Sequence, residues 1–580
     1  MQLLACQLSG GVQRINCRDV YCTTRKSSLR SSGWNFSVAL MTLNNEVETR
    51  QSTDYPESYR QTLLPWFALI CALFIGARLW RLTSSCLWFD EIFSVHAARH
   101  SWSNLLYFVA ADIIHPPFFY VLLKIWIGLG GESVSWLRSL PVIFGIASIL
   151  PFTLLCRELK LKTAEINLAL LLLAVNGYLI KYAQEVRMYS LLFFLSLCSI
   201  WLFFRLFNRG DDEEERGKKT LAALCLINLV LVYTHYAGWL VVGLEAVVLL
   251  LWQRRRLAHF LFTIGLLLVA YLPWVYEVIK VAGHADSGRG IGQNIGWVTR
   301  PGLFDLAQYF VLLNRPFLFV QSSTDTGFNL VMAAIAFILF GLPLLALFLD
   351  PKNKEPKDVR IYALIVFFLA PVILAFVLSW VSPYSVWGTR HLSIAAGPYA
   401  ILAAVALRRL QPHWIRITVL AVLGSWLLLS AAVFLFSRPP NFIWCSWQQL
   451  AAQMSAAESN SSGPVQVYAY EDLVAYHLWF ALESPDNKRF KVAAVKNVPG
   501  ITEDPAYFLP RAFTGIAVQK TPALAGDKVW VAFRSNQWDE TRPPLDGIKG
   551  SGYQVGRSVT VKAQGQQAFL VELLKARSGP

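Results

Sequence analysis

The sequence predicts an all-α membrane protein: a polytopic helical bundle of about 11–13 spans, followed by a small C-terminal α/β domain. Of its 580 residues, 55% are hydrophobic and only 15% are charged, against roughly 25% charged residues in an ordinary soluble domain. The mean hydropathy is +0.44. Long apolar stretches, such as residues 63–82, approach the ~20 residues that cross a hydrocarbon core. Few buried helices of soluble proteins stay apolar on every side for so long.

The first span is preceded by a polar and basic arm, residues 1–60. The arm lacks the apolar core of a secretory signal, so we expect it to be disordered, with Met41 as an alternative start. Basic flanks stay in the cytoplasm, which puts the amino terminus inside and the loop 83–115 outside. The apolar segments of the membrane domain, residues 61–437, are 63–82, 116–130, 139–156, 166–182, 188–207, 220–236, 238–252, 258–280, 328–349, 359–381, 391–407 and 415–436.

The basic residues gather in short loops, at Arg254–Arg256, 351–360 and Arg408–Arg409. Cytoplasmic loops of membrane proteins show this bias, and the clustering argues against the nucleic-acid binding that a net charge of +15 would otherwise suggest. Strict alternation of the segments would put these loops outside. If the stretch 116–156 makes one net crossing through a short broken helix, or if one span is unrecognised, the order of inside and outside shifts by one and these loops lie inside. Residues 438–580 then form an extracytoplasmic domain of a multi-pass protein of the cell (inner) membrane.

Residues 438–580 differ in character from the membrane domain, because short strand-like and helix-like segments alternate in them. Such alternation is typical of a small α/β domain. The predicted strands are 464–470, 489–495, 528–533 and 568–574, and the predicted helices are 444–457 and 472–482. No Gly-rich phosphate fingerprint occurs in this part of the sequence.

The nine cysteines include no CxxC pair and no metal-ligand spacing, so the sequence indicates no zinc or redox site. Those in apolar spans are expected to be packing residues: Cys71, Cys156, Cys198 and Cys225. Cys86 and Cys445 both fall in segments expected outside, and a disulfide between them is left open.

The sharpest local feature is Trp88-Phe89-Asp90-Glu91, directly after the first span. Two adjacent carboxylates at a membrane surface are costly unless they are solvated, paired or functional. Asp90 is a candidate general base, since a carboxylate within hydrogen-bond reach can take a proton from an acceptor hydroxyl. The alternative is that both carboxylates start a helix and favour its dipole. His96 and His100 follow at a spacing that can hold a metal, but no third ligand is evident, and an amphipathic helix lying on the membrane explains them.

Further polar clusters lie in the other loops expected outside, among which 281–327 is the longest within the membrane domain. His115 precedes two prolines, a pattern that also simply starts a helix. Glu185 and Arg187 either pair with each other or line a polar cavity, and Thr234-His235-Tyr236 is a similar turn. Arg390 stands at the mouth of a span, where it either binds a phosphate or reaches toward lipid headgroups.

Together these motifs resemble those of the GT-C class of membrane glycosyltransferases. The resemblance is to the protein O-mannosyltransferase-like family that includes the aminoarabinose transferase of lipid A and the bacterial Rgt-type enzymes. The match covers roughly residues 63–410, and His391 stands where the family usually has tyrosine. The motifs that carry it are Asp90-Glu91, His115-Pro116-Pro117, Arg138 with Pro141, Gln184-Glu185-Val186-Arg187-Met188-Tyr189, and Arg390-His391.

The resemblance implies a polyprenyl-phosphate sugar donor, and transfer on the outer face to a lipid, glycan or protein acceptor. It implies Asp90 as the catalytic base and Arg390 as a ligand of the donor phosphate. The remaining members of the implied site are supporting or substrate-binding residues: Glu91, His115, Glu185, Arg187 and Tyr189. No cofactor or metal is required, because arginine can neutralise a departing phosphate; a divalent cation at Asp90 and Glu91 stays open. The sugar and the acceptor stay open as well.

The alternative function is a transporter or flippase of lipid-linked sugars. Such a protein needs ionisable residues deep inside its spans. Glu245 is the only acidic residue that the sequence places well inside a span.

Overall fold

The computed structural model describes residues 57–208, 214–284, 294, 296–318, 326–349, 359–460, 463–483, 489–511, 513–548, 551–563 and 565–576. The expectations for the arm up to residue 56, for Met41 as a start, and for the basic residues 351–358 lie outside the described residues. From Thr62 onward the chain forms one compact unit.

The membrane domain is built from helices whose bounds follow the predicted apolar segments closely. The first are α2 (Glu57–Leu79), α3 (Phe89–Arg99), α4 (Trp102–Asp112), α5 (Phe118–Gly130), α6 (Val134–Ala147), α7 (Ile149–Glu158), α8 (Thr163–Val175), α9 (Gly177–Ala183) and α10 (Tyr189–Phe207). They are followed by α11 (Glu214–Thr234), α12 (Ala237–Trp252), α13 (Arg254–His284), α15 (Leu303–Asn314), α16 (Thr326–Ala336), η1 (Phe337–Gly341), α17 (Leu342–Leu349), α18 (Val359–Val381), η2 (Thr389–Ala395), α19 (Ala396–Arg409) and α20 (His413–Phe436).

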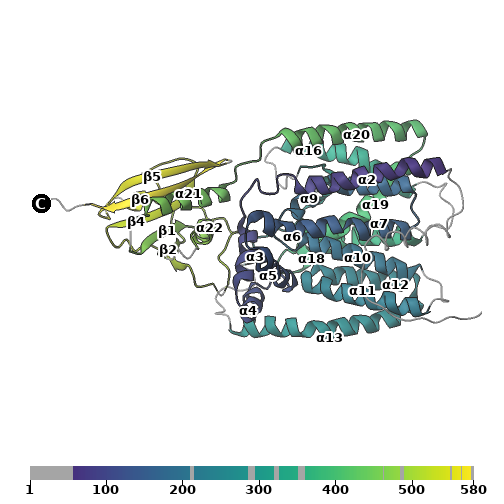
Figure 1. Cartoon of the computed structure of the whole chain (residues 1–580), viewed down its shortest axis with the longest axis horizontal. Helices are drawn as coiled ribbons and strands as arrows, with labels where there is room; N and C mark the ends of the chain where they lie inside the picture. Colours follow the sequence, from purple (N-terminus) through teal and green to yellow (C-terminus); the bar gives the residue numbers. More distant parts are fainter. Residues whose placement is uncertain are drawn as a thin grey trace, which may run out of the picture. The chain divides into compact units, whose positions relative to one another are not determined.

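Within the described residues, 8 helices are long and apolar enough to cross a membrane. Shorter apolar helices accompany them, and these include α5 and α15. The long helices run side by side, whereas α3, α4 and α5 gather at one end of the bundle (Figure 1). Of all these helices, the sequence analysis missed α15 as an apolar segment, because it lies within the expected outer loop 281–327. We call the end of the bundle that carries α3 the site face.

α5 begins and ends at the site face and does not cross the bundle. Near its start, the ring centroid of His115 lies 5.2 Å from that of His235 in the α11–α12 turn. Near its end, Trp126 stacks on Trp136 of α6 with ring centroids 4.3 Å apart, and Lys124 donates a 3.1 Å hydrogen bond to the carbonyl of Ala98 in α3. At 1.5 Å per residue, 13 residues extend only about 20 Å. We therefore expect the stretch 116–156 to make one net crossing, through α6 and α7.

The burial of α10, α19 and α20 shows where the core of the bundle lies. α10 and α19 are buried along most of their length, and α10 contacts α6, α7, α11 and α12. α20 instead exposes Leu428, Leu429 and Phe436. Apolar side chains on the outside of a bundle face lipid, where exposure costs nothing. α10 and α19 are thus the central helices, and α20 is peripheral.

The C-terminal part contains one mixed sheet with two helices before and within it. The elements are α21 (Ile443–Ala457), β1 (Val465–Tyr470), α22 (Asp472–Leu482), β2 (Phe490–Val495), β3 (Ala517–Gln519), β4 (Lys528–Ser535), η4 (Asp546–Ile548), β5 (Tyr553–Ala563) and β6 (Gln566–Lys575). The strand order is β3-β2-β1-β4-β6-β5. The pairs among β1 to β4 are parallel, and β6 pairs antiparallel with β4 and β5. The predicted α/β character is confirmed; the sequence analysis missed β3 and β5.

Candidate active site

Asp90 is the second residue of α3, and its side chain turns toward Arg390 of η2. The Asp90 Oδ2 atom accepts a 2.7 Å hydrogen bond from Arg390 Nη1 and lies 4.0 Å from Nη2 of Arg187. About a quarter of the carboxylate side chain is exposed. The helix start is capped by its neighbour instead, since Glu91 Oε2 accepts the backbone N–H of Trp88 at 3.1 Å. The helix-start role therefore falls to Glu91, and the role of Asp90 as a general base stays a prediction.

Glu91 is fully buried, and both of its oxygens have partners. Arg138 of α6 donates to them at 3.0 and 2.8 Å. Oε1 also accepts the backbone N–H of Val186 at 2.9 Å. An ion pair this deeply buried persists when additional hydrogen bonds satisfy the remaining lone pairs. Glu91 is therefore placed to position the start of α3 and the loop 184–188.

Arg187 reaches the site face from the loop between α9 and α10, and it is buried. Its Nη1 lies 3.3 Å from the Asp90 carbonyl, from Ser94 Oγ and from Tyr120 Oη. The Glu185 side chain turns away from it and pairs with Lys181, so the two predicted residues do not pair through their side chains. Burial raises the pKa of Glu185, against the effect of the lysine.

Arg390 approaches Asp90 from the mouth of α19, as the family resemblance implied. Its Cζ lies 5.8 Å from the ring centroid of Tyr189, within the range of a cation–π contact. Tyr189 opens α10, and among the described residues its hydroxyl has no hydrogen-bond partner. The predicted residues Asp90, Arg187, Tyr189 and Arg390 thus converge on one place, although they come from three separate segments.

Three histidines meet beside this cluster: His115, His235 and His391, whose ring nitrogens lie within 4.8 Å of one another. Burial lowers the pKa of His115 well below its ordinary value and that of His235 to about 3, so both are neutral at pH 7. The backbone N–H of Ala237 donates to Nδ1 of His235 at 3.0 Å, and Arg187 Nη2 lies 3.5 Å from Nδ1 of His115. These contacts place both ring protons on Nε2. Among the described residues, neither Nε2 atom has a partner.

This arrangement suits an anion better than a metal ion. A ring nitrogen that carries a proton has no lone pair to give to a metal, and the neighbouring guanidinium of Arg187 repels cations. Two buried N–H groups without partners instead offer hydrogen bonds to an incoming acceptor atom. His115 was predicted from the sequence as a site residue, but the meeting of the three histidines was not.

Asp112 is a buried carboxylate of the site that the sequence analysis missed. It ends α4, and Asn294 donates to its Oδ1 at 3.1 Å from 182 residues away. Burial raises the pKa of Asp112 to about 7, while the charge of Arg187 acts to lower it and that of Asp90 to raise it. The residue lies in the apolar run FVAADII, which carried no signal of its own.

The C-terminal domain covers α3. The ring of Phe89 lies 5.1 Å from those of Tyr476 and Tyr507, and Nδ1 of His96 is 2.9 Å from the hydroxyl of Tyr476. Burial lowers the pKa of His96 to about 3. Most of α3 is buried, so the expectation that this helix lies on the membrane surface is wrong. Aromatic side chains of α22 occupy the place that lipid was expected to take.

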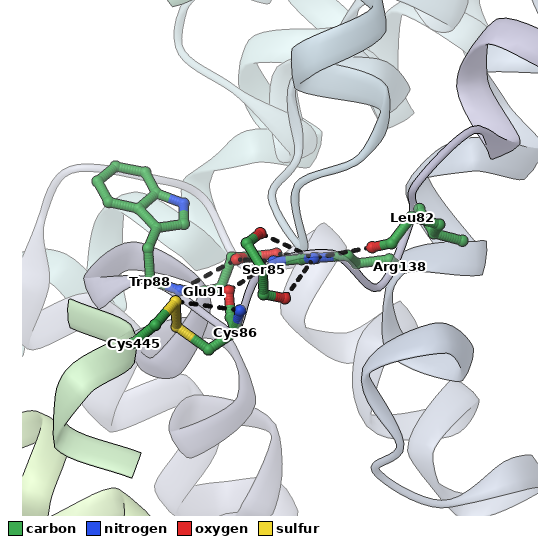
Figure 2. The surroundings of a disulfide bond; sticks show 7 residues. All are labelled: Leu82, Ser85, Cys86, Trp88, Glu91, Arg138 and Cys445. Atoms are coloured by element: carbon green, nitrogen blue, oxygen red, sulfur yellow. Dashed lines mark hydrogen bonds and ion pairs between the residues drawn. A yellow bond between two sulfur atoms is a disulfide. The ribbon is translucent and has the colours of Figure 1, made fainter. Parts of the chain in front are cut away.

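Cys86, just before α3, and Cys445, in α21, form the disulfide that the sequence left open, with Cα atoms 5.4 Å apart (Figure 2). The remaining four cysteines within the described residues are free thiols. Cys156 and Cys198 are buried, and Cys71 and Cys225 are partly buried, in agreement with a packing role.

No protein-family model matches the sequence, and no curated protein matches it. Among solved structures, ArnT from Cupriavidus metallidurans bound to undecaprenyl phosphate is similar, with 15% identity over 89% of this chain and 99% of that chain and a TM-score of 0.55. Its apo state gives 14% identity, 89% and 98% coverage, and a TM-score of 0.52. The Archaeoglobus fulgidus oligosaccharyltransferase tethered with an acceptor peptide gives 14% identity over 72% and 63%, with a TM-score of 0.45.

The fold is that of a polytopic membrane protein with a small C-terminal sheet domain. Over nearly the full length of both chains, this protein has the fold of ArnT. The predicted resemblance is thereby confirmed at the level of the fold.

Proposed function

We propose that this protein is a glycosyltransferase that moves a sugar from a polyprenyl-phosphate donor to an acceptor hydroxyl on the outer face of the cell membrane. The observation that carries the proposal is the pairing of a partly exposed carboxylate, Asp90, with Arg390 at 2.7 Å, beside a buried group of N–H donors. ArnT, which shares the fold, has been solved with undecaprenyl phosphate bound.

The donor phosphate is proposed to bind between Arg390, Arg187 and the Nε2 atoms of His115 and His235. Arginine offers a planar fork of N–H donors that matches phosphate oxygens. The two histidine N–H groups are buried and, among the described residues, have no other partner. Fixed donors in a water-poor site stabilise negative charge strongly, because they need no reorganisation as the charge develops. The set thus favours the leaving polyprenyl phosphate.

Asp90 is proposed to take the proton of the acceptor hydroxyl. The hydroxyl oxygen then forms the new bond to the anomeric carbon of the sugar, and the bond from this carbon to the phosphate oxygen breaks. The bonding pair leaves with the polyprenyl phosphate, and Asp90 later passes its proton to water. Such a base contributes on the order of 10²–10⁴-fold to the rate.

We propose that the reaction needs no metal or other cofactor. A cation held between Asp90 and Glu91 would have to displace Arg138 and two backbone N–H groups from Glu91. Arginine side chains supply the positive charge that a metal would bring to a leaving phosphate.

The transporter alternative finds no support at Glu245, the acidic residue that the sequence places well inside a span. Glu245 of α12 is buried, and its oxygens accept hydrogen bonds from Ser199 at 2.6 Å and Asn228 at 2.8 Å. A satisfied carboxyl group of this kind is a packing and hydrogen-bonding element of the core, with no need of a substrate.

The outer location of the site is supported by the disulfide, since such bonds persist in oxidising compartments. With Cys86 and Cys445 outside, the C-terminal domain is extracytoplasmic and the membrane is the cell (inner) membrane.

The test is an assay of the purified protein in detergent with polyprenyl-phosphate sugars, in which release of polyprenyl phosphate is measured. Turnover without a membrane barrier excludes transport as the sole function. Absence of turnover with every such sugar, by a protein whose fold is intact, would refute the proposal. Mass spectrometry of the glycolipids and glycans of a deletion strain would then identify the sugar, its hexosyl or pentosyl class, and the acceptor.

A further inference from the structure

Residues 80–88 connect α2 to α3 and lead directly to Asp90, and they contain no helix or strand. Within the segment the Ser84 N–H donates to the Arg81 carbonyl at 3.0 Å, and a connecting segment with so little internal hydrogen bonding keeps its shape mainly because other parts of the chain hold it. Its first residues are held by Gln184, which donates to the Trp80 carbonyl at 2.9 Å, and by the Leu435 carbonyl, which accepts from Arg81 Nη2 at 2.9 Å. Its end next to α3 is held by Arg138 of α6, in the membrane domain, and by Cys445 of α21, in the C-terminal domain (Figure 2).

Arg138 holds the segment through its backbone carbonyls. Its Nη1 donates to the carbonyls of Leu82 at 2.8 Å and Ser85 at 3.0 Å, and its Nη2 donates to that of Cys86 at 2.8 Å. The same guanidinium pairs with Glu91 at 2.8 Å. A single buried side chain therefore joins the segment to the first turn of α3.

Cys445 holds the segment from the other side. Its sulfur is bonded to that of Cys86, and the backbone N–H of Cys86 also donates to Cys445 Sγ at 3.2 Å. The bond is not needed to attach the C-terminal domain, because α20 ends at Phe436 and α21 begins at Ile443, only a short connection later. Its effect is consequently local, on the shape of residues 80–88.

The held segment ends at the catalytic carboxylate. Glu91 Oε1 accepts the N–H of Val186 at 2.9 Å, which fixes the loop that carries Arg187. Asp90, the neighbour of Glu91, lies between Arg187 and Arg390. A chain of direct contacts therefore runs from the disulfide through Arg138 and Glu91 to the geometry of Asp90.

We propose that the Cys86–Cys445 disulfide is a positioning element for Asp90, and that its reduction lowers turnover reversibly. In the oxidised protein, the segment 80–88 has one arrangement and Asp90 meets Arg390. Reduction breaks the S–S bond with two electrons and two protons, supplied in the test by dithiothreitol, and leaves two thiols. The segment then keeps the contacts with Arg138 and those of Trp80 and Arg81, but its end next to α3 loses the bond to the C-terminal domain, so Asp90 samples positions away from Arg390. The effect on turnover rests on the proposed function, whereas the effect on the segment does not.

The test compares the oxidised protein with the same protein reduced by dithiothreitol, in detergent. We expect amide hydrogen exchange of residues 80–91 to become about tenfold faster, with no change in the central helix α10. Turnover of a polyprenyl-phosphate sugar should fall by about 10- to 100-fold, the cost of a small misplacement of a reacting group. The KM for the donor should change less than kcat, because Arg187 and the histidines stay in place. Reoxidation should restore both readouts.

The matched variants are C86S/C445S, which should behave as the reduced protein, and C71S, which should respond to dithiothreitol as the natural chain does. The inference is overturned if exchange of residues 80–91 is the same in the oxidised and reduced proteins. It is also overturned if C86S/C445S turns over at the rate of the oxidised natural chain. If the oxidised natural chain acts on no polyprenyl-phosphate sugar, the proposed function fails, while the exchange comparison still decides the positioning role.

Discussion

Asp90 and Glu91 are neighbours in the chain, yet their side chains differ in burial and in their partners. Glu91 has no exposed surface and is surrounded by donors from Arg138, Val186 and Trp88. Asp90 keeps a quarter of its side chain exposed and has arginines as its side-chain partners. A base must exchange protons with substrate and water, so exposure and a free lone pair matter more than burial. By this criterion we propose Asp90 as the reactive carboxylate and Glu91 as the supporting one.

Replacing Asp90 by asparagine should reveal the base directly. Asp90→Asn keeps the shape of the side chain and removes its basicity, so we expect turnover to fall by on the order of 10²–10⁴-fold. Expression and donor binding should stay close to normal. The measurement is single-turnover transfer by the purified variant. A rate within a few-fold of the natural chain would show that Asp90 is not the base.

Arg390 should matter for the donor. Arg390→Ala removes the proposed phosphate ligand and leaves Asp90 without its 2.7 Å partner, so the KM for the polyprenyl-phosphate sugar should rise and kcat should fall. Arg390→Lys should restore only part of both, since lysine lacks the planar fork. Donor titrations of the two variants check this. A normal KM and kcat in both variants would mean that Arg390 reaches toward lipid headgroups and does not bind the donor phosphate.

Asp112 should make donor binding depend on pH near neutrality. Its pKa is raised to about 7 by burial, so it loses its proton as the pH rises through this value. The new negative charge compensates Arg187 and weakens the attraction for a phosphate, so the KM for the donor should rise above pH 7. Because the folded pKa exceeds the ~3.9 of an unfolded aspartate, the contribution of this group to stability declines between about pH 4 and 7.

The control for this prediction is Asp112→Asn, which cannot ionise. Its donor KM should be nearly flat between pH 6 and 8.5, and close to the low-pH value of the natural chain. The same pH dependence in both proteins would assign the effect to another group.

At the scale of elements, the sequence predicted most helices because long apolar segments dominate them. Two elements show where this reasoning stops. The sequence of α5 is like that of a span, because prolines precede it and its residues are apolar. The stacking of Trp126 on Trp136, which holds the end of α5 at the site face, is a tertiary contact that the sequence of the helix does not show. β5 alternates polar and apolar residues at Val559 and Val561, but its register shifts between Val555 and Ser558, which breaks the pattern.

Residues of the candidate site could be predicted from the sequence where a charged residue lies near the end of an apolar segment, as Asp90 and Arg390 do. Asp112 escaped because it lies within an apolar run and acquires its environment from Asn294, which is distant in the sequence. The meeting of His115 with His235 and His391 likewise depends on the packing of three separate segments. Such contacts follow from the folded arrangement and leave no local pattern to read.

Cysteine labelling can test the course of α5. Ser103 in α4 and Ser135 in α6 are both exposed and flank this helix in the chain. If α5 stays at the site face, Ser103→Cys and Ser135→Cys should both react with an impermeant thiol reagent in intact cells. Lys162→Cys, in the loop that follows α7, should not react. Labelling of only one of the two serine positions would show instead that α5 crosses the membrane.

For the whole molecule, we expect an odd number of crossings between the basic loops and the C-terminal domain. We expect Ser459→Cys, after α21, to be labelled in intact cells, because it is exposed and its domain lies outside. Arg255→Cys, at the start of α13, should be labelled only after the membrane is permeabilised. Labelling of Arg255→Cys but not Ser459→Cys in intact cells would reverse the proposed orientation and place the site face in the cytoplasm.

The disulfide between Cys86 and Cys445 can form only late in synthesis, because 359 residues separate the two cysteines along the chain. At about 5–20 residues per second, the ribosome needs roughly 20–70 s to deliver the second cysteine after the first. The thiol of Cys86 waits through this interval while the spans are inserted. If Cys86 is oxidised early to a mixed disulfide with glutathione or with another protein, that disulfide must be exchanged before Cys86 can pair with Cys445 of the C-terminal domain. We therefore expect the yield of active protein to follow the thiol-isomerase capacity of the host more closely than its capacity for membrane insertion.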